Sequence, residues 1–119
     1  MHNCGPHPAA DYYLDHTPTI NGINCSFRYT RDSLPLLRKA FAGRGLVQLM
    51  FDNGETAETM VAGFRLLMEE LAPEVIALPM PQVDDSWSDA EIIDLYYAMR
   101  EVAVEYAANM CWREEGGGV

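Results

Sequence analysis

Residues 88–112, SDAEIIDLYYAMREVAVEYAANMCW, carry the clearest structural signal in this chain of 119 residues. Ser88 and Glu91 have the spacing of a capping box, which marks the start of a helix. No glycine or proline follows before Gly116. The pattern therefore predicts one helix over about residues 89–113, roughly 37 Å long at 1.5 Å per residue, which is longer than a small domain needs.

This helix is apolar over most of its circumference. Its two apolar stripes are, first, Ile92, Leu95, Tyr96, Met99, Val102, Ala103, Tyr106 and Met110 and, second, Ile93, Tyr97, Val104, Ala108 and Cys111. Such a helix must be covered on more than one side, whereas a domain of this size covers one side well. We therefore expect a second chain on the remaining face, as a homodimer or as a partner complex.

The partner-binding residues predicted on this helix form one set. They are Ile93, Tyr96, Tyr97, Met99, Val104 and Trp112. Met99 belongs at the same time to the stripe that we expect to face the core, so the sequence leaves open which face is core and which is interface.

The remaining elements follow from shorter patterns. The sequence predicts a strand over 23–30, preceded by an Asn21-Gly22 hairpin turn and a short limb over 17–20. It predicts a helix over 34–42 with Gly43 as its left-handed cap, a helix over 55–71 capped by Asp52, and an extended connector over 73–87. Residues 46–51 are expected to form a buried strand that could pair with 23–30, and their periodicity alone leaves a short helix open. The fold class predicted is α+β, mainly α, with three main helices and either a short β-hairpin or two to three short strands.

The length suits one domain. We expect a flexible N-terminal arm over residues 1–18, because three prolines interrupt it, a single globular domain over 19–113, and a flexible tail over 114–119.

The chain is acidic, with 18 Asp and Glu residues against 8 Lys and Arg residues and a formal net charge of −10. Repulsion by phosphate argues against direct nucleic-acid binding and against anionic membrane surfaces. Residues 1–44 carry three acidic and five basic residues, and residues 45–119 carry 15 acidic and three basic residues. The acidic part is either a solvated surface or a patch that steers a basic partner.

Cysteine usage and the absence of a signal-peptide pattern favour a cytoplasmic protein with reduced thiols. His2, Cys4, His7 and His16 are the residues that most resemble a metal site, but they lack strong ligand spacing, so no metal and no cofactor is predicted. No nucleophile, base and orienting group converge in the sequence, and we expect no enzymatic activity and no catalytic residues.

Two resemblances add an expectation about function. In size, charge and helix content, and in the segment SDAEIIDLYYAMREVAVEYAANMCW, the chain resembles the QslA-type quorum-sensing antiactivators. That resemblance implies a regulatory protein that binds the ligand-binding domain of a LuxR-type transcription factor and blocks its dimerisation and its engagement of DNA. The segment INGINCSFRYTRDSLPLLRKAF, together with the capped acidic helix, is similar to phage tail assembly chaperones, which implies another kind of binding protein.

Overall fold

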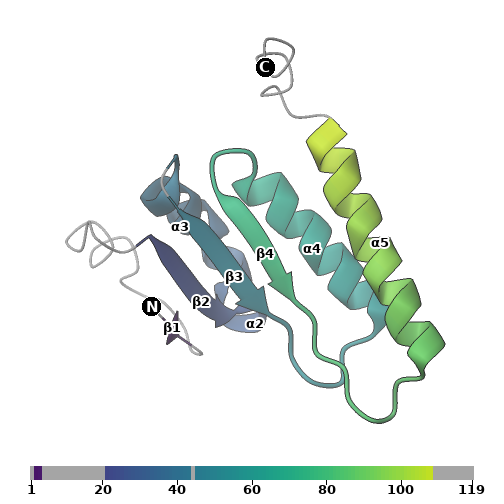
Figure 1. The fold of residues 1–119 in the computed structure, drawn as a ribbon. Coiled ribbons are helices and arrows are strands. Elements are labelled where there is room, and N and C mark those ends of the chain that lie inside the picture. The colour runs from purple at the N-terminus through teal and green to yellow at the C-terminus, as the bar shows by residue number, and fades with distance from the viewer. Residues whose placement is uncertain (1, 4–20, 44, 109–119) are drawn as a thin grey trace.

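The computed structural model describes residues 2–3, 21–43 and 45–108 (Figure 1). The elements run in the order β1 (His2–Asn3), β2 (Gly22–Ser26), α2 (Phe27–Thr30), a 3-10 turn (Arg31–Ser33), α3 (Leu34–Phe41), β3 (Leu46–Met50), α4 (Ala57–Leu71), β4 (Ile76–Met80) and α5 (Asp89–Ala108). The four strands form one sheet in the order β1-β2-β3-β4, and all neighbouring pairs are parallel.

The predicted fold class is confirmed: the fold is α+β and mainly α, with three main helices, α3, α4 and α5, and short strands. The strands and helices alternate along the chain, so the pairing of β2 with β3 is parallel and is connected through α3. The alternative of a β-hairpin with its turn at Asn21-Gly22 is wrong. Gly22 is the first residue of β2 and lacks the positive φ that such a turn requires, which among the described residues Gly43 and Gly54 have. Residues 17–20 lie outside the described residues.

Two other element predictions are corrected. The strand expected over 23–30 ends at Ser26, and the next four residues are helical. Phe27 and Thr30 are buried, whereas Tyr29 is exposed, so burial here follows a three-residue spacing and not a period of two. The Phe27 ring packs on Phe51 with a centroid distance of 5.0 Å, which holds this turn against the core.

The predicted connector over 73–87 contains the strand β4. Pro79 fits in this strand because β4 is at the edge of the sheet. The Ile76 N–H donates to Gly45, and the Met80 carbonyl accepts from Phe51, so alternate residues direct their backbone groups toward β3. The backbone groups of Pro79 point the other way, toward the free edge of the sheet. Because proline has no N–H, this edge lacks one hydrogen-bond donor, which hinders the addition of another strand.

The helix boundaries follow the predictions closely. Gly43 has φ of +72° just after α3, as its capping role requires. The side chain of Thr56, and not that of Asp52, caps α4 by accepting from the Thr59 N–H at 3.2 Å. Of the predicted N-terminal arm, His2 and Asn3 pair with β2 as β1, and the rest lies outside the described residues, as does the tail over 114–119.

Helices α3 and α4 cover one face of the sheet (Figure 1). Alternate residues of β2 and β3 point into this core and are almost completely buried: Ile23, Cys25, Val47 and Leu49. They form one cluster with the buried faces of the helices, which include Leu34, Leu37 and Phe41 from α3 and Met60, Leu67 and Leu71 from α4. The other residues of the same strands point to the opposite face.

Gly63 allows α4 to approach this core closely. A Cβ atom at Gly63 would lie 2.5 Å from Cε1 of Phe51 and 3.3 Å from Cε2 of Phe27. The Phe51 ring is almost fully buried and has little room to move. Gly63 is therefore required by packing and not by backbone conformation.

Replacing Gly63 with alanine should lower the free energy of unfolding by about 1 kcal/mol, because an overpacking cost of about 1–3 kcal/mol exceeds the helix-propensity gain of about 1 kcal/mol. Urea denaturation measures the change. In a Phe51→Leu background, which removes the obstructing ring atom, the same substitution should be neutral or stabilising. A stabilising Gly63→Ala change in the natural background would contradict this packing.

Candidate protein-binding site

Helix α5 begins at a fully formed capping box. The Ser88 N–H donates to Oε1 of Glu91 at 2.9 Å, and the Glu91 N–H donates to Oγ of Ser88 at 3.2 Å. These hydrogen bonds lower the pKa of the Glu91 carboxyl. The predicted start of the helix is confirmed, and α5 is described as far as Ala108.

One stripe of α5 packs on α4. Leu95, Met99 and Val102 are buried in the common core. Two polar contacts border this stripe: Nη1 of Arg65 lies 2.6 Å from Oε2 of Glu105, and the hydroxyl of Tyr106 donates to Oε1 of Glu69 at 2.9 Å. Partial burial and the bond to Glu69 raise the pKa of Tyr106.

The opposite stripe of α5 is solvent-exposed. Ile93, Tyr97 and Val104 are 53%, 56% and 54% exposed, and Tyr96 beside them is 62% exposed. At about 100° per residue, the first three lie roughly half a turn from the buried stripe. The rings of Tyr96 and Tyr97 contact each other edge to face with a centroid distance of 5.3 Å. We call Ile93, Tyr96, Tyr97 and Val104 the α5 patch.

The structure divides the predicted partner-binding residues. Ile93, Tyr96, Tyr97 and Val104 come together on one accessible side of α5. Met99 is only 7% exposed and packs in the core, and the part of it that remains accessible lines the groove described below. Trp112 lies outside the described residues.

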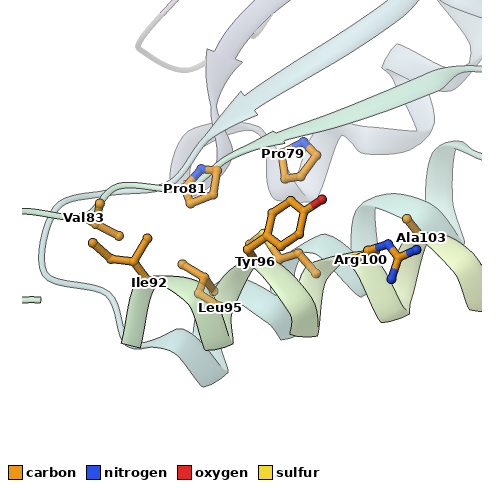
Figure 2. Close-up of a pocket in the computed structure, with 9 residues that line it drawn as sticks. Pro79, Pro81, Val83, Ile92, Leu95, Tyr96, Arg100 and Ala103 are labelled. Atoms are coloured by element: carbon orange, nitrogen blue, oxygen red, sulfur yellow. The ribbon is translucent and has the colours of Figure 1, made fainter. Parts of the chain in front are cut away.

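A groove borders the α5 patch, and the sequence did not predict it. It has a volume of about 550 Å³, and Figure 2 shows it between α5 on one side and β4 with the segment that follows it on the other. Its lining residues are Pro79, Pro81, Val83, Ile92, Leu95, Tyr96, Met99, Arg100 and Ala103. Tyr96 belongs to both the groove and the patch, so the two form one continuous apolar surface.

Arg100 is the charged residue that lines this groove. The ion pairs among the described residues join Arg28 to Asp52, Arg38 to Glu74 and Arg65 to Glu105, so Arg100 has no carboxylate partner there. A free guanidinium beside an apolar groove can bind a carboxylate on an apolar peptide segment. The only sequence signal for this site was one basic residue within a long acidic helix.

The described residues bring together no three His, Cys, Asp or Glu side chains that could hold a metal ion. Of the residues that resembled a metal site, His2 lies in β1, and Cys4, His7 and His16 lie outside the described residues. Cys25 is completely buried within the core. Ser88 has its capping role. Ser86 donates its hydroxyl and its N–H to Oδ1 of Asp84 at 2.5 and 2.8 Å, and these hydrogen bonds lower the pKa of that carboxyl.

Comparisons with known proteins give no relative. No protein-family model, curated protein or solved structure matches the chain. Within the described residues, no helix has the length and apolar character needed to cross a membrane.

Replacing Ser88 with alanine should lower the free energy of unfolding by about 1 kcal/mol, because it removes a side-chain cap of α5. Ser33 offers a matched control, since it occupies the cap position of α3 without a side-chain capping hydrogen bond. Ser33→Ala should therefore cost clearly less in the same urea denaturation experiment. Equal losses for the two variants would show that the capping box contributes nothing specific.

Proposed function

We propose that this protein is a non-enzymatic regulator that acts by binding another protein through the α5 patch and the adjoining groove. The observation that carries the proposal is the exposure of Ile93, Tyr97 and Val104 on the stripe of α5 that faces away from α4, with the exposed Tyr96 beside them. Exposed aromatic anchors that become buried in a complex provide much of the binding energy of protein interfaces.

The partner that we propose is the ligand-binding domain of a LuxR-type transcription factor, as the resemblance to QslA-type antiactivators implies. In this proposal the α5 patch covers the apolar surface through which the regulator dimerises. The regulator then stays monomeric and no longer binds DNA. Such a partner is cytoplasmic, and the proposal places this chain in the same compartment.

The charges around the α5 patch affect partner choice more than affinity. Asp94 and Glu101 are exposed beside the patch, whereas Glu105 is already paired with Arg65. Exposed acids at the rim attract a basic partner and speed its association, and salt screens this attraction. The groove adds a second requirement, namely an apolar side chain of the partner with a carboxylate close enough to reach Arg100.

The affinity for a purified LuxR-type ligand-binding domain tests this proposal. The double variant Tyr97→Ala, Val104→Asp should bind at least about thirtyfold more weakly, since one truncated anchor typically costs about 2 kcal/mol. Both side chains are more than half exposed, so circular dichroism should show an unchanged fold.

Tyr29→Ala is the matched control, because Tyr29 is an exposed aromatic residue on α2. This variant should keep the original affinity.

Sedimentation of the natural chain mixed with the regulator domain should also show that the regulator domain is no longer a homodimer. A folded double variant that binds as tightly as the natural chain, or a regulator domain that remains dimeric in the complex, would contradict the proposal.

A further inference from the structure

The face of the sheet opposite α3 and α4 carries three rows of side chains. The strand registers align Gly22, Leu46 and Ile76 in one row, Asn24, Gln48 and Leu78 in the next, and Ser26, Met50 and Met80 in the third. Five of these nine positions are large apolar residues and none is charged. We call this surface the open sheet face.

Among the described residues, the open sheet face is exposed mainly along β4, whereas Ser26 in β2 is only 7% exposed and the other positions of β2 and β3 are partly buried. Ile76 is 60% exposed, and Leu78 and Met80 are 39% and 37% exposed. Parallel sheets are normally covered on both faces, because their strands are apolar on both sides. The sequence of β4, IALPM, has this character. An aliphatic surface of this kind indicates a binding partner.

The polar residues at the centre of the face are already paired. Nδ2 of Asn24 donates to Oε1 of Gln48 at 2.7 Å across the two strands. A partner can therefore cover this pair without breaking the hydrogen bond between them, which lowers the cost of removing water from the face.

The charges near the two ends of the strands are also paired. At the carboxyl ends, Arg28 lies 3.7 Å from Asp52. At the amino ends, Arg38 lies 2.9 Å from Glu74, and the pKa of that carboxyl is lowered by the bond. The open sheet face thus gives a charged partner little to recognise.

The excess of acidic residues lies on the other side of the molecule. Residues 57–108 carry eleven acidic and two basic side chains, and eight of these acids lie on α4 and α5. Two copies that met through these helices would bring their negative charges together. Two copies that met through their open sheet faces would hold the acidic helices on the outside of the dimer.

We propose that the open sheet face is the homodimer seam of this protein and packs against the same face of a second copy. The two sheets lie about 10 Å apart and are related by a twofold axis, so the same surface serves both chains. Met50 and Met80 have flexible side chains that adjust to fill the contact. This seam leaves the α5 patch free, in contrast to a homodimer formed through α5.

Sedimentation equilibrium of the full chain tests this seam. The natural chain should have twice the chain mass of 13.3 kDa at micromolar concentration. Ile76→Lys, and the double variant Ile76→Lys, Leu78→Lys, should weaken dimerisation at least about tenfold, because the twofold axis brings like charges into a desolvated contact. The single variant changes a side chain that is mostly exposed in one chain, so its fold should persist, as circular dichroism can verify.

The control is the double variant Tyr97→Ala, Val104→Asp, which should remain dimeric. Dimerisation of the natural chain should also tighten as salt is added, because salt screens the repulsion between two chains of charge −10. A natural chain that is monomeric, a dimer that survives Ile76→Lys, a dimer that the α5 variant dissociates, or a dimer that salt weakens would each overturn the proposal.

This inference does not depend on the proposed function. Monomeric Ile76→Lys should still bind the LuxR-type domain as tightly as the natural chain does. If that domain binds no form of the protein, the proposed function fails, while the sedimentation results still decide the seam.

Discussion

Consecutive strands of this sheet are neighbours in space, and each connection from β2 to β4 steps in the same direction across the sheet. Parallel strands are joined by right-handed crossovers, so connections that keep one direction place their helices on one face. α3 and α4 therefore share a face, and no helix among the described residues covers the other face. α5 follows the edge strand and packs on α4, which leaves its outer stripe exposed. Both apolar surfaces of the protein follow from this single constraint.

The helices could be predicted because their signals are local. The Ser88–Glu91 capping box and the left-handed Gly43 require only neighbouring residues, and both are confirmed. The direction of strand pairing depends on segments more than 20 residues apart, which a period of two does not encode. β4 was missed because Pro79 argues against a strand unless the strand is known to be at an edge.

The candidate site, like the fold, could be predicted from the sequence only in part. Helical geometry alone placed Ile93, Tyr97 and Val104 on one stripe, and the structure leaves that stripe exposed. The same geometry assigns Met99 to the buried stripe, where it packs in the core and lines the groove. The groove beside Tyr96 could not be predicted, because it forms where β4 and the segment after it pass α5 (Figure 2). The uncharged open sheet face suits a second copy of the chain, whereas the α5 patch with its acidic rim suits a basic partner.

Methyl NMR of the methionines tests most directly whether the open sheet face is covered in solution. A soluble paramagnetic agent broadens the signals of accessible methyl groups, and Met80 is 37% exposed in the single chain, whereas Met60 is fully buried. The account predicts that the Met80 methyl group is nearly as protected as that of Met60 in the natural protein and becomes accessible in Ile76→Lys. A Met80 methyl group that is equally accessible in both proteins would contradict it.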